Sequence, residues 1–167
     1  VPASVHRDIP AEWVQMMIDQ RKGLQGIERL GVDVFLISFG LMGMNLVDML
    51  TIEEKPKDNI LHYHRTKTKD VKNDQAEMFV RIEPCIAEIM KDYLGEQRVF
   101  RFHTMYSTRL NLTIAVNDGL KKWYTRNKID KHFTFYSARH TWPTLAASKK
   151  LGIESSIITD ALAHSDK

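Results

Sequence analysis

The chain has 167 residues, 43% of them hydrophobic and 27% charged, a composition typical of a soluble globular domain that excludes disordered, collagen-like and low-complexity chains. The longest apolar stretch, residues 34–44, is about half as long as a membrane-spanning helix must be, so no membrane partner is expected. A single cysteine, Cys85, excludes a disulfide framework and a cysteine-based zinc site, which suits a reducing cytoplasm.

Positive charge is concentrated in one part of the chain. The net charge is +3, but residues 96–150 carry 11 lysines and arginines against 3 acidic residues. Clustered cations release counterions from phosphates, so this segment favours a polyanionic partner. A solvated basic surface is the alternative interpretation.

The first half of the chain predicts helices followed by a hairpin. One helix is expected to begin at Pro10, and a second, over residues 24–42, is apolar enough to be the central buried helix. Two glycines end it, and Asn45 is the expected cap of a short helix. Alternating residues at 60–65 and 76–82 predict two strands joined by a charged hairpin over 67–74.

The second half predicts helices only. They are expected over residues 84–94, 107–127, 135–150 and 155–164, with Gly119 weakening the middle of the second. No internal repeat or interdomain linker interrupts the sequence. We therefore predict one domain of the α+β class, mainly α, with a small antiparallel sheet.

Three polar residues of the 135–150 segment share one face. Tyr136, Arg139 and His140 are spaced i, i+3 and i+4, so a helix brings them together. A guanidinium beside an imidazole and a phenol suits binding of a phosphate oxygen. The alternative is an arginine paired with a carboxylate beside a solvated histidine. Further along, Ala-Leu-Ala-His-Ser presents His164 at the end of the last predicted helix.

These motifs resemble a known family. Residues 134–165, from Thr-Phe-Tyr-Ser-Ala-Arg-His to Ala-Leu-Ala-His-Ser, are similar to the signature of tyrosine recombinases, the phage-integrase family found on mobile elements. Residues 38–50, which contain Gly-Met-Asn-Leu-Val-Asp, resemble the family's Thr-Gly-Met-Arg motif, and residues 63–68 resemble the hairpin that carries its catalytic lysine. The resemblance covers nearly all of residues 7–167 and implies the recombinase catalytic-domain fold, a helical bundle with a small antiparallel sheet.

The resemblance implies site-specific DNA recombination through a 3′-phosphotyrosine intermediate, with no metal and no cofactor. Arg139 would be the second of two arginines that clamp the scissile phosphate. Lys67 would be the general acid, and His164 would hydrogen-bond the phosphate. His140, next to Arg139, would act through its neighbours without touching the phosphate, and Asp48 would hold the active-site arginines in place.

Two positions depart from the family pattern. Asn45 stands where the first arginine is expected, and its amide brings no positive charge. Tyr136 stands where a histidine acid or base is usual, and a phenol with a pKa near 10 is a weak base at neutral pH. Arg65 and Arg109 are candidates for the missing charge. The departures also motivate an alternative, a catalytically silent DNA-binding module on the same fold.

The family pattern carries expectations about domain organisation. The nucleophilic tyrosine would follow His164 beyond the end of the chain, and residues 1–8 would link to a preceding core-binding domain. We therefore expect residues 9–167 to be a catalytic domain truncated at its C-terminus and monomeric in solution. Its expected partners are double-stranded DNA and other recombinase protomers, in a bacterial cytoplasm.

Two weaker signals lie outside these motifs. Trp123-Tyr124 is flanked by cations, so this segment could contact DNA phosphates with aromatic support, or the tryptophan could pack inwards beneath solvated lysines. The cations proposed for DNA binding are Lys121, Lys122, Arg126 and Lys128, together with Arg65. His62 and His64 place two imidazoles on one strand face, as in zinc sites, but no third ligand follows at a suitable spacing. We therefore expect solvent-facing histidines and no metal; a metal-dependent hydrolase is the distant alternative.

Overall fold

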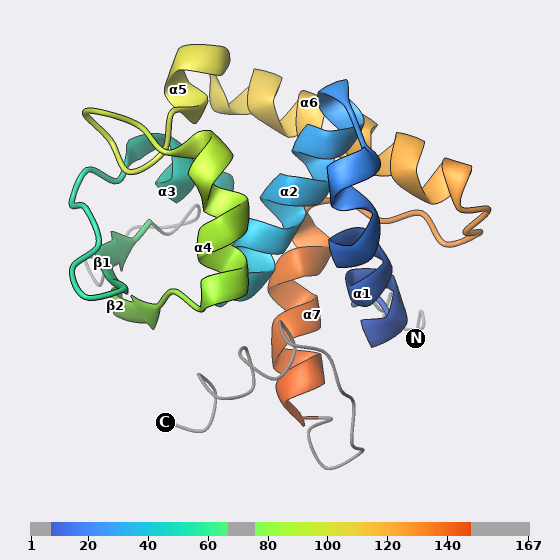
Figure 1. Cartoon of the computed structure of the whole chain (residues 1–167), viewed down its shortest axis with the longest axis horizontal. Helices are drawn as coiled ribbons and strands as arrows, with labels where there is room; N and C mark the ends of the chain where they lie inside the picture. Colours follow the sequence, from blue (N-terminus) through green and yellow to red (C-terminus); the bar gives the residue numbers. More distant parts are fainter. Residues whose placement is uncertain (1–7, 67–75, 148–167) are drawn as a thin grey trace, which may run out of the picture.

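The computed structural model describes residues 8–66 and 76–147, without the side chains of 144–147. It is mainly helical, with one small sheet at an edge of the molecule (Figure 1). The elements in chain order are α1 (Ala11–Gln20), η1 (Arg21–Gly23), α2 (Gly26–Gly40), α3 (Leu46–Thr51), β1 (Ile60–Arg65), β2 (Ala76–Arg81), α4 (Pro84–Met90), η2 (Lys91–Tyr93), α5 (Phe102–Met105), α6 (Arg109–Arg126) and α7 (Tyr136–Ala147). The predicted class, α+β and mainly α, is confirmed.

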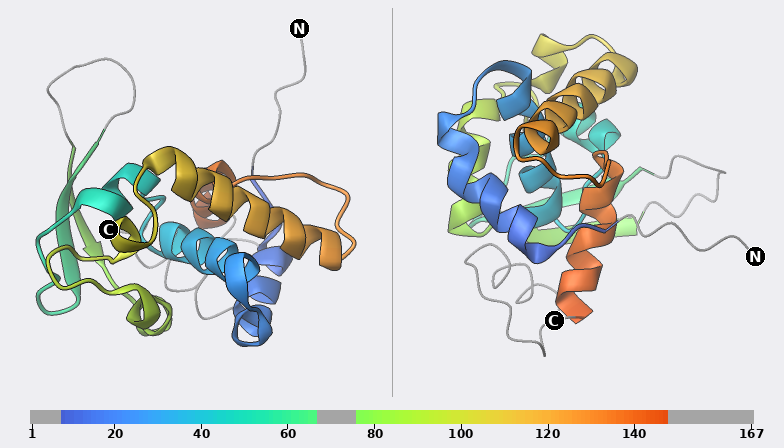
Figure 2. Two further views of the ribbon diagram at one scale, coloured as in Figure 1. Left: turned by 90° about the horizontal axis from the view of Figure 1, so that it is seen from above. Right: turned by 90° about the vertical axis from the view of Figure 1, so that its right-hand side faces the viewer.

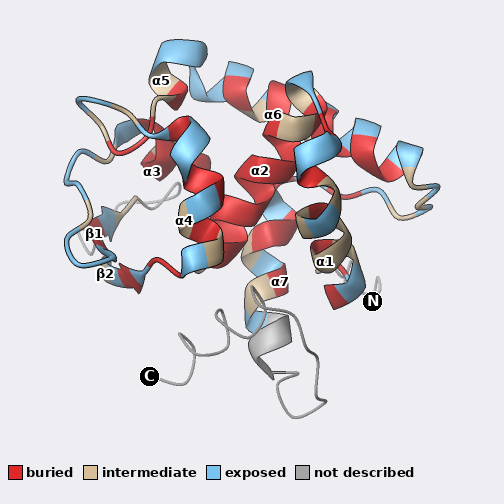
Figure 3. Cartoon of the chain, in the orientation of Figure 1, coloured by how far each residue is buried: buried red, intermediate tan, exposed pale blue. Residues whose placement is uncertain are grey.

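The helix α2 is the centre of the core. Nearly all of its residues from Leu30 onward are buried, and the other helices surround it (Figure 3). Its one charged residue in this stretch, Asp33, is fully buried and accepts hydrogen bonds from Arg21 Nε at 2.7 Å and from the Tyr93 hydroxyl at 2.6 Å. Because a buried carboxylate needs such partners, this network fixes α2 against η1 and η2.

Two glycines allow α2 and α6 to cross closely. A Cβ atom added at Gly119 would lie 1.9 Å from the Ile27 carbonyl oxygen, and one added at Gly31 would lie 2.6 Å from that of Val116. Backbones can approach this closely only where neither helix presents a side chain. The helix α6 continues without a break through Gly119, which therefore serves the crossing and is not a weak point of the helix.

The strands β1 and β2 pair antiparallel and lie at one edge of the molecule (Figure 2). Leu61, Tyr63 and Val80 are buried on the side that faces the core. On the other side, His64 of β1 lies opposite Glu77 of β2, and His62 lies opposite Phe79. The strands begin and end within a residue of their predicted bounds.

The other predictions on elements have mixed outcomes. Asn45 caps α3 as expected, and α4 begins at the predicted proline. The short helix α5 was not predicted. The predicted hairpin over 67–74 and helix over 155–164 lie outside the described residues. None of the described helices combines the length and apolar character that crossing a bilayer requires.

Candidate functional site

Three helices begin around one cavity of about 390 Å³. Its walls come from the first turns of α3, α6 and α7 and from the segment before α7. The lining residues are Asn45, Leu46, Val47, Arg109, Leu110, Thr113, Asn117, Thr134, Phe135, Tyr136 and Arg139. Three predicted site residues, Asn45, Tyr136 and Arg139, therefore share a cavity with one of the two arginines considered for the missing charge.

The turn between α2 and α3 allows α7 to lie close to it. Gly43 has φ of +80°, and its backbone N–H donates to the Ser38 carbonyl at 2.7 Å. A Cβ atom at position 43 would lie 3.2 Å from Arg139 Cα and 2.8 Å from Trp142 Nε1. Glycine is therefore required here both by the backbone conformation and by the space that α7 leaves.

Asn45 is held by hydrogen bonds at both ends of its amide. Its Oδ1 accepts from the Asp48 backbone N–H at 2.8 Å, which caps α3, and its Nδ2 donates to the Thr66 carbonyl at 2.9 Å. Asp48 completes the link, because both of its carboxylate oxygens lie 3.3 Å from the Thr66 backbone nitrogen. The start of α3 thus fixes the backbone at the end of β1, one residue before Lys67.

Asp48 is surrounded by cations but is almost fully buried, with 1% of its surface exposed. Burial raises the pKa of its carboxyl group, against the opposing effects of the hydrogen bonds from Thr66 and the charges of Arg65 and Arg139. Arg65 also donates to the Met42 carbonyl at 3.0 Å, which directs its side chain to the α2–α3 turn. Asp48 is therefore close enough to feel the charges of both arginines, and its supporting role stays a prediction.

Tyr136, Arg139 and His140 share one face of α7, as their spacing predicts. The Arg139 guanidinium lies over the Tyr136 ring at 5.9 Å, and the His140 ring is stacked beside that ring with centroids 6.3 Å apart. Arg139 is half-buried, whereas Tyr136 and His140 are exposed. The phenol ring thus supports the arginine at the cavity wall, and the His140 ring packs against the same phenol ring.

The sequence motifs do not identify the α6 wall of the cavity. Arg109, Thr113 and Asn117 line it, and their spacing of four residues places them in one row along the helix. Asn117 Oδ1 accepts the Phe135 backbone N–H at 2.9 Å, which joins α6 to the segment that precedes α7. This polar row at four-residue intervals, beside the buried side of α6, is the signal that could have found them.

The cavity is suited to an anion. Arg109 and Arg139 supply two positive charges, and none of the described residues that line the cavity is acidic. The first residues of α6 and α7 also line the cavity, and the N-terminal end of a helix carries partial positive charge and unpaired N–H groups. Within residues 8–66 and 76–147, no histidine, cysteine or carboxylate belongs to the lining, so this part of the lining offers no ligand set for a metal ion.

Two predicted catalytic residues, Lys67 and His164, lie outside the described residues. Their distances to Arg139 therefore remain predictions.

Of the two interpretations of the Trp123-Tyr124 segment, the structure shows the one in which the tryptophan packs inwards. Trp123 is fully buried and donates from Nε1 to Gln20 Oε1 at 2.9 Å, and Tyr124 is buried too, so neither ring supports a surface contact. Arg126 makes two hydrogen bonds with Glu28, at 2.7 and 2.9 Å. The exposed lysines at 121, 122 and 128 are the cations that remain at this end of the helix.

Comparison of the chain with protein-family models, with curated proteins and with solved structures finds no match. The resemblance to tyrosine recombinases therefore depends on the sequence motifs alone.

Proposed function

We propose that the chain is the catalytic domain of a tyrosine recombinase and that its cavity binds the scissile DNA phosphate. One observation supports this most strongly. Arg139, the arginine of the family motif, shares an acid-free cavity with a second arginine, Arg109. Two guanidinium groups that converge on one space are suited to the two non-bridging oxygens of a phosphodiester.

In this proposal Arg109 replaces the arginine that the family has at the position of Asn45. Arg109 and Arg139 neutralise the charge that develops on the non-bridging oxygens, and Tyr136 adds a hydrogen bond. A tyrosine outside this chain loses its hydroxyl proton to solvent and attacks the phosphorus as a phenolate, so a phosphotyrosine bond forms as the bond to the 5′-oxygen breaks. Lys67 gives its proton to the departing 5′-oxygen, and the hydrogen bonds to Thr66 fix the backbone next to it.

A second candidate, a catalytically silent DNA-binding module, is favoured by the hydrogen bonds of Asn45. Its amide oxygen and one amide hydrogen are already used within the protein, so Asn45 does not replace an arginine directly. If Arg109 does not supply the missing charge, the cavity would bind a phosphate without cleaving DNA.

The test uses the full-length natural protein that contains this chain, with DNA nicked so that a cleaved strand cannot be rejoined. The enzyme is expected to form a protein–DNA adduct that survives denaturation. Arg109→Ala and Arg139→Ala should each lower the rate of adduct formation by about 100-fold or more, since a lost electrostatic donor costs that much at such sites.

The control is Arg81→Ala, which removes an exposed guanidinium outside the cavity and should leave the rate unchanged. DNA binding without any adduct would support the silent module. An adduct that forms at the wild-type rate in Arg139→Ala would contradict the proposed site.

A further inference from the structure

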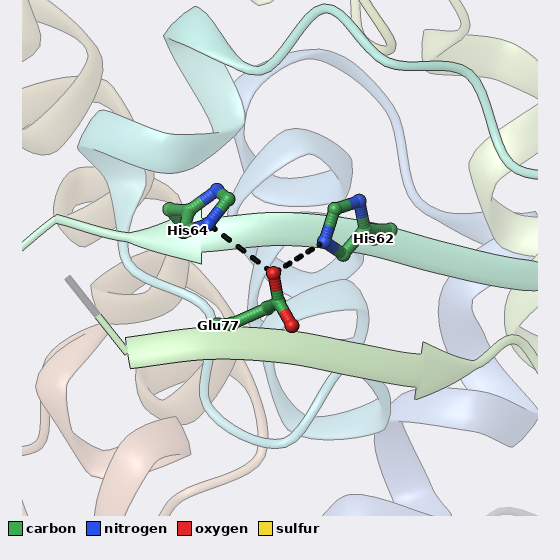
Figure 4. Close-up of side chains that lie close together, drawn as sticks. All are labelled: His62, His64 and Glu77. Carbon is green, nitrogen blue, oxygen red and sulfur yellow. Dashed lines mark ion pairs between the residues drawn. The ribbon is translucent and has the colours of Figure 1, made fainter.

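The hairpin carries a cluster that is separate from the cavity. His62 and His64 are two residues apart on β1 and so lie on one face, and strand pairing places Glu77 of β2 opposite His64. The three side chains point toward one another above the sheet (Figure 4). The sequence pattern offered two imidazoles without a third ligand, and the register of the hairpin supplies that ligand from 13 residues further along the chain.

The distances in this cluster fit a small metal ion. Glu77 Oε2 lies 3.2 Å from His62 Nε2 and 3.4 Å from His64 Nε2, and all three ligand atoms lie within 4.8 Å of one another. Zinc binds imidazole nitrogen and carboxylate oxygen at about 2.0–2.2 Å, which places two ligand atoms of a tetrahedron about 3.3–3.5 Å apart. The separation of 3.4 Å lies within this range, and the separation of 3.2 Å is about 0.1 Å below it.

His62 is oriented as metal-binding histidines are. Its Nδ1 lies 2.7 Å from Glu54 Oε2, and its ring stacks on Phe79 with centroids 4.5 Å apart. The opposite nitrogen, Nε2, is shielded from solvent and faces Glu77 Oε2 at 3.2 Å. A carboxylate on one ring nitrogen fixes the tautomer that leaves the other nitrogen free to bind a metal.

We propose that His62, His64 and Glu77 bind a divalent transition-metal ion of the zinc type. Nε2 of each histidine and one oxygen of Glu77 are the ligands, and Glu54 is the carboxylate that positions His62. Three protein ligands leave a fourth position for water. The ion would join the end of β1 to the start of β2 and so would stabilise the pairing of the two strands. Its ligand His64 lies two residues before Thr66.

The alternative is a carboxylate that pairs with two protonated imidazoles and binds no metal. Isothermal titration calorimetry, with zinc added to the metal-free chain, distinguishes the metal site from this ion pairing. We expect saturable binding of one zinc ion per chain and a melting temperature that rises with zinc concentration. His64→Gln and Glu77→Gln should each weaken zinc binding by about 100-fold, and Glu54→Gln by about 10- to 100-fold.

The control is His132→Gln, which removes an exposed imidazole elsewhere and should leave zinc affinity unchanged. His64 and Glu77 are each about half exposed, so their variants should keep the wild-type melting temperature when zinc is absent. No saturable binding, or equal affinity in His64→Gln and Glu77→Gln, would overturn the metal site. No DNA is present in this experiment, so its failure would leave the recombinase proposal unaffected.

Discussion

Asn45 and Asp48 connect the start of α3 to the end of β1 through the backbone of Thr66. The same carboxylate lies near Arg65 and Arg139, so it also balances the charge beside the cavity. The asparagine therefore has a structural role that does not depend on phosphate binding. The ionisation of Asp48 should affect the free energy of unfolding of the protein.

We predict that the contribution of Asp48 to stability falls as the pH rises above about 4. Above this pH most of an ordinary aspartate is ionised. Burial raises the pKa of Asp48, so the folded state holds its proton more tightly than the unfolded state. The contribution of Asp48 to the free energy of unfolding is then largest below the unfolded pKa and falls as the pH passes through the folded pKa.

Comparison with Asp48→Asn isolates this effect, because the amide keeps the shape and does not titrate. The free energy of unfolding, measured by denaturant titration, should rise in the variant relative to wild type as the pH rises above about 4. A difference that is constant with pH, or that falls, would contradict the assignment.

Part of the candidate site could be predicted from the sequence. Spacing along one helix was enough to place Tyr136 and Arg139 together, and the motif brought Asn45 to them. Arg109 could be named only as a candidate, because its position in the cavity depends on how α6 packs across α2. The stacking of the His140 ring on the Tyr136 ring could not be predicted, because it depends on side-chain rotamers.

The backbones of α2 and α6 pack closely where the two helices cross, and sequence patterns did not reveal this contact. Gly119 reads as a weak helical position when α6 is considered alone, because glycine costs about 1 kcal/mol relative to alanine within a helix. The partner helix reverses this expectation, since the carbonyl oxygen of Ile27 occupies the space that a side chain would need.

We therefore predict that Gly119→Ala lowers the free energy of unfolding by about 1–3 kcal/mol, the usual cost of overpacking, instead of raising it. Gly23→Ala is the matched control, because a Cβ atom there has no neighbour within 4 Å. It should leave stability unchanged or raise it by up to about 1 kcal/mol. Equal stability of the two variants in denaturant titration would show that the helices can separate to accept the methyl group.

The elements themselves were largely predictable from local patterns. Period-2 alternation located both strands, and cap and breaker residues located the starts of α3 and α4. The four-residue helix α5 was missed because it is too short to show a helical period. The pairing of Glu77 with the two histidines also escaped prediction, since it depends on the register of the hairpin.

Over the whole molecule, the basic segment is divided between two places. Arg109 and Arg139 lie at the cavity, whereas exposed lysines lie toward the other end of α6, which is about 27 Å long. Arg126, within the same segment, is neutralised by Glu28. The charge pattern thus predicted an anionic partner, but only the packing of the helices shows which cations share one space.

The salt dependence of DNA binding tests the central claim, that Arg109 and Arg139 bind one DNA phosphate. Binding of this chain to a DNA duplex is followed by fluorescence anisotropy at several salt concentrations. Each cation lost from a phosphate contact should reduce the slope of log affinity against log salt by about 1. We predict this reduction for Arg109→Gln and Arg139→Gln, and a wild-type slope for Lys91→Gln, which removes an exposed cation outside the cavity. Wild-type slopes in both arginine variants would contradict the account.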